Sequence, residues 1–385
     1  MKKTSIIFTG DIGFDKYMEG KWEDEQLFSE SVLDFFHSAD HVCANVEGAL
    51  CGVDPTIPRD VCFHAMNPAA TKALQKIGAD IWSIGNNHTM DAQKDGIVST
   101  LKIAAQLDCR TFGAGMNIED ASKPLYLDEA GGIGMIGVTY MNDCIPATET
   151  EPGIFRWDDM DLIAKRIAEI KAKCRWCVVV SHGGEEFAAM PLPYTRDRYL
   201  KYLKMGADVV VGHHPHVPEN YELFDNGKAI FYSLGNFVFD TDYQRVHQYT
   251  DIGILLKLNF TEEKMDFEAI GIQIIRGPEQ IDIAPLPDIF TNIPADEFEL
   301  LAPLSAKAFV EEEKRKMIFL KPQRFTDFTQ EDWDCYFATE TSGSFYAGAH
   351  HDFRTIVPFS LKADEGHWKE SKLEKVKQHI LRQLY

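Results

Sequence analysis

The residues best suited to chemistry in this chain are three histidines that follow a short apolar run. Residues 209–211 are all valine, and Gly212 then precedes His213, His214 and His216. Such a run is typical of a buried strand, and a glycine lets the chain turn sharply at its end. Because imidazole is a common metal ligand, the pattern favours a metal site at the end of this strand over a polar loop.

Four other apolar segments also end in residues that can bind a cation. These endings are Asp11 after residues 4–10, Asn45 and Glu47 after 39–44, Asn86, Asn87 and His88 after 80–85, and His182 and Glu186 after 177–181. Each ending alone is equally typical of a helix cap, a turn or a buried histidine. Five strands that end in this way indicate one shared site, because open α/β sheets place their sites at the carboxyl ends of strands.

The predicted metal ligands combine carboxylate, amide and imidazole groups. They are Asp11, Glu47, Asn87, His182, His214 and His216, with Asn86 and His213 as alternatives. Mixed oxygen and nitrogen ligands suit manganese, iron or zinc, and this set exceeds the about four ligands of one tetrahedral ion. We therefore expect two divalent cations, with Glu47 as the bridging carboxylate. Two-metal sites activate a bound water near neutral pH and hold both the attacking and the leaving oxygen.

His88 is the predicted catalytic residue. It follows an amide ligand directly in the sequence, which would place its ring beside the metals. An imidazole with a pKa near neutrality donates or accepts a proton readily, so we expect His88 to protonate the leaving group as a general acid. The alternative is a hydrogen bond that supports a neighbouring ligand.

A second set of residues is predicted to contact the substrate, which we expect to be a small or polymeric anion. The set is Arg59, Asn86, Glu186, His213 and Asn236. Arg59 lies in the turn-rich segment 54–60, where a guanidinium at the edge of a pocket would pair with an anionic group. Asn236 follows Gly235, and a Gly-Asn pair is equally typical of a simple turn.

Six short motifs together resemble the CapA family. They are Gly10-Asp11, Asn45-Val-Glu47-Gly, Gly85-Asn86-Asn87-His88, His182-Gly-Gly, Gly212-His-His-Pro-His216-Val and Tyr232-Ser-Leu-Gly-Asn236-Phe-Val-Phe-Asp240. That family is named for capsule poly-γ-glutamate synthesis and is related to the calcineurin-like metallophosphoesterases. The resemblance covers residues 4–275 and implies an α/β fold, specifically a four-layer α/β/β/α sandwich with a two-metal centre at the strand ends.

The resemblance also implies roles for individual positions. Seven residues match metal-site positions of the wider superfamily: Asp11, Glu47, Asn87, His88, His182, His214 and His216. One position departs from the pattern, since Gly13 stands where the superfamily has a histidine ligand of the first metal. Asp15 or Glu186 would be the residues to compensate for that missing ligand.

Composition limits the classes of partner and the compartment. The 385 residues include 39 Lys and Arg against 60 Asp and Glu, a net charge of −21 that argues against nucleic-acid binding. The first residues lead directly into a strand without a signal-peptide core, and no segment reaches the about 20 apolar residues of a membrane span. The sequence thus predicts a cytoplasmic protein and leaves its oligomeric state open.

Periodicity divides the chain into two parts. Helices are expected at 91–107, 160–173 and 194–205 between the strands, and residues 252–260 and 265–274 are typical of a β-hairpin. We expect a metallophosphoesterase-like domain over 1–284 and a mainly helical C-terminal extension over 285–385 that packs on it.

Two functions are consistent with these residues. The first is a metal-dependent hydrolase, in which a metal-activated water attacks a phosphoester. The alternative is a protein that synthesises, processes or binds an anionic polymer such as poly-γ-glutamate. The number of retained ligands favours an enzyme over a protein whose site has decayed.

Overall fold

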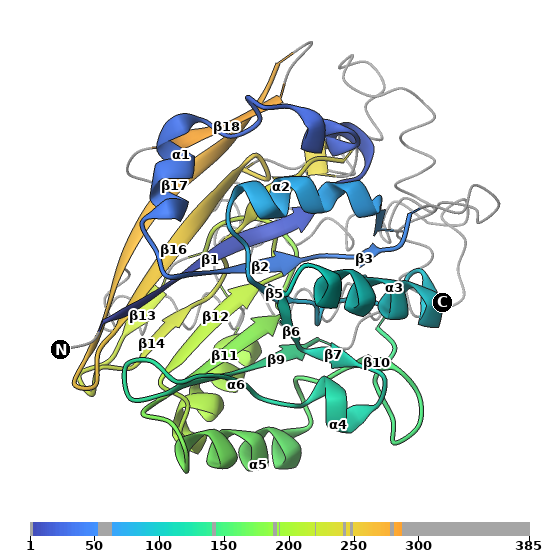
Figure 1. Ribbon diagram of the computed structural model, residues 1–385. Helices are drawn as coiled ribbons and strands as arrows, with labels where there is room; N and C mark the ends of the chain where they lie inside the picture. Colours follow the sequence, from blue (N-terminus) through green and yellow to red (C-terminus); the bar gives the residue numbers. More distant parts are fainter. Residues whose placement is uncertain are drawn as a thin grey trace, which may run out of the picture.

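The computed structural model describes residues 3–52, 64–140, 144–187, 191, 193–219, 221–241, 244–246, 249–277 and 281–286. Arg59 and the predicted C-terminal extension beyond residue 286 lie outside these ranges. The described chain is a mixed α/β structure built on two main sheets (Figure 1). The predicted α/β class is therefore confirmed.

The larger sheet has the strand order β18-β17-β16-β1-β2-β5-β6, and β15 also pairs with β1. Strands β1, β2, β5 and β6 run parallel, whereas β16, β17 and β18 form an antiparallel side that contains the predicted hairpin. The bounds are β1 Thr4–Gly13, β2 His41–Val46, β5 Ile81–Ser83, β6 Arg110–Phe112, β15 Asn236–Phe239, β16 Ile252–Phe260, β17 Met265–Arg276 and β18 Ile281–Leu286.

The second sheet has the order β13-β14-β12-β11-β9-β8. Its inner strands β9, β11, β12 and β14 are parallel, and antiparallel β8 and β13 close its two sides. The bounds are β8 Leu125–Leu127, β9 Ile133–Thr139, β11 Trp176–His182, β12 Val209–His213, β13 Tyr221–Leu223 and β14 Ala229–Phe231. All five strands that the sequence predicted to end in ligands are present.

Most of the helices connect parallel strands, and α3, α5 and α6 match the three helices that the sequence predicted between strands. Their bounds are α1 Glu30–His37, α2 Thr71–Lys76, α3 Gln93–Gln106, α4 Ile118–Ala121, α5 Met160–Lys171 and α6 Pro193–Met205. Short 3-10 helices lie at Lys16–Met18, Lys21–Glu23, Pro68–Ala70 and Gln244–Val246. Two small two-stranded sheets pair β3 Ala49–Leu50 with β4 Ala65–Met66, and β7 Ala114–Gly115 with β10 Gly153–Ile154. No helix among the described residues is both long and apolar enough to cross a membrane.

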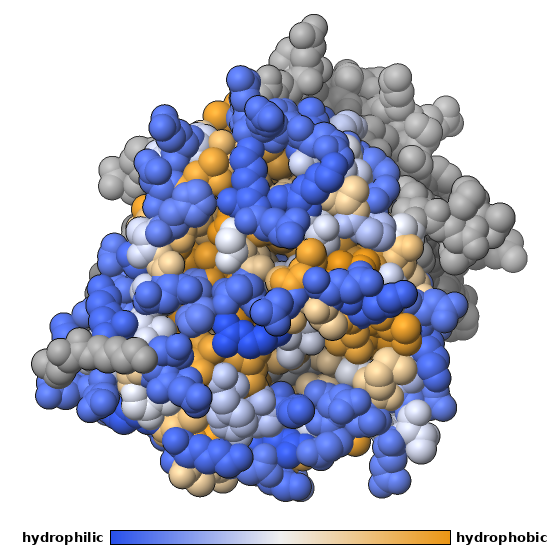
Figure 2. All heavy atoms as spheres, viewed as in Figure 1, coloured by the Kyte–Doolittle hydropathy of each residue, from blue (hydrophilic) through white to orange (hydrophobic). Residues whose placement is uncertain are grey.

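Alternating side chains divide the core into three apolar clusters. One contains Phe8 of β1 and Val180 of β11, so it joins the two main sheets. A second joins the other side of the larger sheet to α1, α2 and α3, and a third joins β11 and β12 to α5 and α6. Successive strand residues point to opposite faces, so Val179 lies in a different cluster from Val180. In Figure 2, hydrophilic side chains cover much of the visible face and apolar ones show in the hollows between them.

Strand β18 crosses the predicted domain boundary at residue 284. Its backbone is bonded to β17 and also to the segment before α1, where Ser29 N–H donates to the Ile283 carbonyl and Ile283 N–H donates to Leu27. The Ile283 side chain is fully buried in the same cluster as Val32 and Phe36. Residues 281–286 are therefore part of the core that precedes the predicted extension.

Replacing Ile283 by alanine should lower the free energy of unfolding by about 2–5 kcal/mol, the usual effect of emptying a buried aliphatic site. The matched control is Ile275→Ala on β17, because Ile275 is 45% exposed whereas Ile283 is 0% exposed. Urea unfolding followed by circular dichroism measures both variants. Equal losses would contradict the assignment of β18 to the core.

Candidate metal centre

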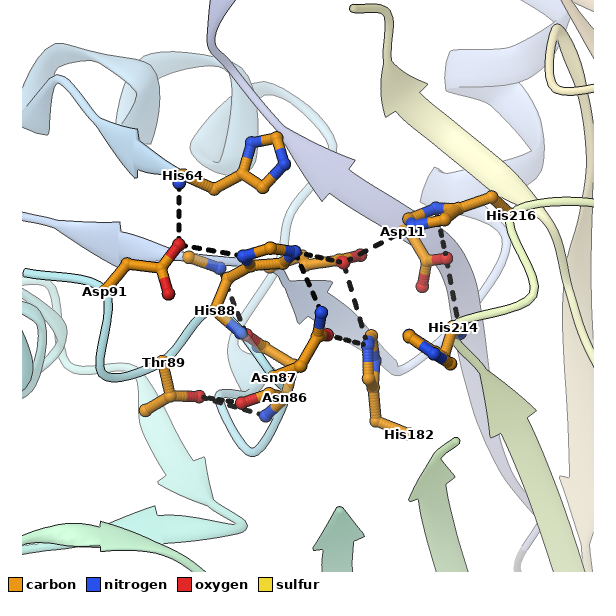
Figure 3. Close-up of polar contacts among 12 residues, drawn as sticks. Asp11, His64, Asn86, Asn87, His88, Thr89, Asp91, His182, His214 and His216 are labelled. Atoms are coloured by element: carbon orange, nitrogen blue, oxygen red, sulfur yellow. Dashed lines mark hydrogen bonds and ion pairs between the residues drawn. The ribbon is translucent and has the colours of Figure 1, made fainter. Parts of the chain in front are cut away.

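The predicted ligands gather at the carboxyl ends of strands from both sheets (Figure 3). Asp11 on β1 lies opposite Asn45 on β2, two residues before Glu47, and His182 on β11 lies opposite His213 on β12. Because parallel strands in register end at one edge, residues far apart in sequence become neighbours there. The five strand endings therefore converge, as the sequence predicted.

Glu47 lies at the centre of this group. Its carboxylate is fully buried, and neither oxygen has a hydrogen-bond partner among the described residues. Three imidazole Nε2 atoms surround Oε1, those of His182 and His216 at 3.7 Å and that of His88 at 3.8 Å. These distances are longer than hydrogen bonds and are close to the roughly 3.4 Å that separates two ligand atoms of one tetrahedral zinc ion.

The environment of Glu47 suits a cation. Burial raises the pKa of Glu47 well above its ordinary value, because the charged form has lost its hydration. Two unpartnered buried oxygens require a compensating partner, and a divalent cation supplies both the charge and the coordination. The residues present therefore fit a metal ion.

The potential ligand atoms form two groups. Asp11, Glu47 and His182 make one, and Glu186, His214 and His216 make the other; within each group these atoms lie within 4.8 Å of one another. Glu186 is the more exposed member, whereas the other five are buried. The described residues thus contain two candidate cation-binding groups that meet at Glu47 and His216, which lie 3.7 Å apart.

His182 and His214 are held in the neutral form that binds metals. Burial lowers the pKa of His182 well below its ordinary value and that of His214 to about 3. His182 Nε2 lies 2.8 Å from Asn87 Oδ1, and His214 Nδ1 is buried without a hydrogen-bond partner among the described residues. A neutral imidazole retains the lone pair through which it binds a cation.

The loop after β12 places its histidines through unusual backbone angles. His214 has a φ of 97° and His216 a φ of 59°, in the left-handed region that few residues other than glycine adopt. A Cβ at Gly212 would lie 1.9 Å from the Tyr232 carbonyl oxygen, so only glycine fits before them. Such local strain is commonly retained where it positions functional groups.

Asparagines and Asp11 orient the ligands. Asn45 Nδ2 donates to Asp11 Oδ1 at 2.7 Å, and His216 Nδ1 lies 2.9 Å from Asn236 Oδ1 and 3.2 Å from Asp11 Oδ2. Although burial opposes ionisation, the hydrogen bond and charge of His216 hold the pKa of Asp11 below its usual range. The ring of His216 is consequently fixed with Nε2 towards Glu47.

His88 is fixed at the edge of the same group. Its Nδ1 lies 2.8 Å from Asp91 Oδ2, its backbone N–H donates to Asn86 Oδ1 at 3.1 Å, and its Nε2 lies 2.9 Å from Asn87 Nδ2. Burial lowers the pKa of His88. The Asp91 carboxylate binds Nδ1 of the ring, so Nε2 faces the site. A histidine that transfers protons requires this arrangement.

The predicted substrate contacts have different surroundings. Asn86 bonds Gly48, Val46 and His88, Asn236 bonds His216, Gln244 and Thr250, and His213 Nε2 lies 2.8 Å from the Thr9 carbonyl oxygen. These bonds favour a supporting role for all three. Glu186 lies beside His214 and His216, and Arg59 lies outside the described residues.

The departure at Gly13 has a steric cause. A Cβ at this position would lie 2.6 Å from the ring of Phe239 on the neighbouring strand β15. Phe239 also packs against the ring of His216, with 4.9 Å between centroids. Phenylalanine therefore occupies the space into which a histidine side chain at position 13 would extend.

Asn45 was not among the predicted ligands, and no role was predicted for His64. Asn45 belongs to the Asn45-Val-Glu47-Gly motif, and its place at a strand end, two residues before Glu47, is the feature from which a role could have been predicted. His64 precedes the short strand β4 and follows no long apolar run, so strand-end patterns gave no signal for it. In the structure it bonds Asp15, and its ring centroid lies 4.2 Å from that of His88.

Comparison with known proteins agrees with this arrangement of motifs. Residues 5–241 match the family described as bacterial capsule synthesis protein PGA_cap, and the chain belongs to that family. The predicted CapA-type membership is confirmed.

Its relatives carry related names. The PGA biosynthesis protein CapA of Bacillus subtilis (strain 168) is 32% identical over 70% of this chain and 71% of its own length. The capsule biosynthesis protein CapA of Bacillus anthracis is 29% identical, over 63% of this chain and 62% of that protein. Crystallised TT1561 of Thermus thermophilus covers 69% of this chain and 98% of its own, with 12% identity and a TM-score of 0.36, too distant to indicate a shared function.

Replacing Glu47 by glutamine, or His214 by alanine, should lower the affinity for zinc or manganese at least about 100-fold, since loss of a supporting residue alone costs up to that much. His41→Ala is the matched control, because His41 also bonds a carboxylate, Asp80, but at the opposite end of β2. Elemental analysis and metal titration measure the result. Full metal content in the Glu47 variant would refute its assignment as a ligand.

Proposed function

We propose that this chain is a metal-dependent hydrolase of the CapA and calcineurin-like phosphoesterase type, with a four-layer α/β/β/α arrangement, that cleaves a phosphoester. The observation that carries the proposal is the buried Glu47 carboxylate, unpartnered among the described residues and surrounded by the Nε2 atoms of His88, His182 and His216. A structural ion would need fewer ligands and no adjacent acid–base group.

The proposed ligands are Asp11, Glu47, Asn87, His182, His214 and His216, and Glu186 is the third member of the group that contains His214 and His216. When bound, manganese, iron or zinc supplies an activated water and stabilises charge on the transferred group. Asp11 and Glu47 offset the cation charge, while the neutral imidazoles of His182 and His214 add ligands without adding charge. Two ions match the two groups of ligand atoms.

His88 is the proposed proton donor. Its Nδ1 is held by Asp91, so the ring cannot rotate freely and Nε2 stays on the side of Glu47. Because Nε2 accepts from Asn87 Nδ2 in the structure, it would first take up a proton and then pass it to the oxygen of the departing group as the bond to phosphorus breaks. Asp91 would stabilise the imidazolium before that transfer and orient the ring throughout.

The relatives' names support a second candidate, the synthesis or processing of a capsule polymer. Two of them are named for PGA or capsule biosynthesis, and a Mycobacterium tuberculosis relative, 23% identical over 55% of this chain, is named a probable polyglutamine synthesis accessory protein. In this alternative the metals and His88 act on, or bind, an anionic polymer. The net charge of −21 disfavours a long polyanion except where cations line its path.

The two candidates are separated by a panel of phosphomonoesters, phosphodiesters and γ-glutamyl peptides, assayed with protein of verified metal content. Phosphate release that depends on added metal supports the hydrolase. Cleavage of γ-glutamyl bonds without phosphate release would replace it with the polymer function.

His88→Ala should keep its metals and lower turnover of alkyl phosphoesters by about 10²–10⁴, the usual contribution of a positioned proton donor. The loss on nitrophenyl esters should be small, because nitrophenolate departs without a proton. Steady-state kinetics on both substrates, with His41→Ala as control, measures the difference. Equal losses on both would place His88 in metal binding instead.

A further inference from the structure

His64 is a buried histidine that the proposed reaction has not used. Its side chain is 7% exposed, and its ring lies between two aromatic neighbours of the site. The ring centroid is 4.2 Å from that of His88, nearly perpendicular at 86°, and 4.9 Å from that of Phe239. His64 therefore contacts the proposed proton donor without belonging to either candidate metal group.

Asp15 fixes this ring from the other side. His64 Nδ1 bonds Asp15 Oδ2, and the Asp15 side chain is 4% exposed. Its second oxygen, Oδ1, is buried with no hydrogen-bond partner among the described residues. An apolar side chain would pack beside Phe239 at lower cost than a buried imidazole–carboxylate pair, which favours a functional reason for the pair.

A single oxygen links His64 to His88. Asp91 Oδ2 lies 2.8 Å from His88 Nδ1 and also accepts the backbone N–H of His64 at 2.8 Å (Figure 3). The backbone of His64 thus orients the carboxylate that holds His88, while the ring of His64 limits the tilt of the His88 ring. Asp15 holds the ring of His64 in place for the second of these contacts.

We propose that His64, anchored by Asp15, is a positioning residue that sets the ring orientation of His88. The inference rests on the proposed function of His88 as proton donor and deepens it. Misplacing a reacting group by about 1 Å can reduce the rate about 100-fold, so the effect should appear in kcat for substrates that need a proton donor.

His64→Gln is the main test, because glutamine can still donate to Asp15 but has no ring to contact His88. We expect unchanged metal content, a loss of about 10- to 100-fold in kcat on alkyl phosphoesters, and little change on nitrophenyl esters. Asp15→Asn, which keeps the size of the anchor, should cause a smaller loss of the same pattern. His41→Gln, which alters the histidine paired with Asp80 at the other end of β2, is the matched control.

A double-mutant cycle decides whether His64 acts through His88. Added to His88→Ala, the His64→Gln change should cost less than about twofold further, since residues that act as a unit are not additive. Independent, multiplying losses would overturn the proposal. Equal losses on both classes of ester in His64→Gln would also overturn it.

A readout that needs no hydrolysis separates this inference from the proposed function. In metal-replete protein labelled with ¹⁵N-histidine, His88 should show one fixed tautomer, and His64→Gln should produce a mixture. That change, in a protein inactive on every phosphoester, would refute the hydrolase and leave the positioning role standing. An unchanged His88 spectrum in an active protein would refute the positioning role alone.

Discussion

The buried carboxylate of Glu47 is the constraint on which the rest of the site depends. Both its oxygens are buried without hydrogen-bond partners among the described residues, and three imidazole nitrogens lie 3.7–3.8 Å from Oε1. An uncompensated buried charge is strongly unfavourable. A cation bound among these residues would offset that charge, and binding it would then be coupled to folding.

The two main sheets together supply the side chains that surround the Glu47 carboxylate. Glu47 and Asp11 come from the larger sheet, and His182, His214 and His216 come from the second. One apolar cluster packs the two sheets against each other. His213 adds a polar contact between them, since its Nε2 lies 2.8 Å from the Thr9 carbonyl oxygen on β1. A histidine that resembles a ligand in sequence thus joins the sheets.

Around the ligands, amide side chains take most of the remaining hydrogen bonds. Asn45 bonds Asp11 and Thr9, Asn86 bonds His88 and Val46, and Asn236 bonds His216, Gln244 and Thr250. Phe239 fills the volume next to Gly13 and packs on both His216 and His64. The site is therefore rigid on the side of β15, which is the property that orienting a proton donor requires.

The sequence by itself determined the α/β class, the five strands that end in candidate ligands and three of the helices between strands, because the spacing of apolar residues and the polar residues at strand ends are local properties of the chain. It could not assign His64 or separate His213 from His214. A side chain's direction after a turn depends on φ, and the left-handed angles of His214 and His216 are set by contacts with distant strands. The pairing of His64 with Asp15 and its contact with His88 join segments far apart in sequence. Only the tertiary structure decided these contacts, since contacts between distant segments leave no local pattern.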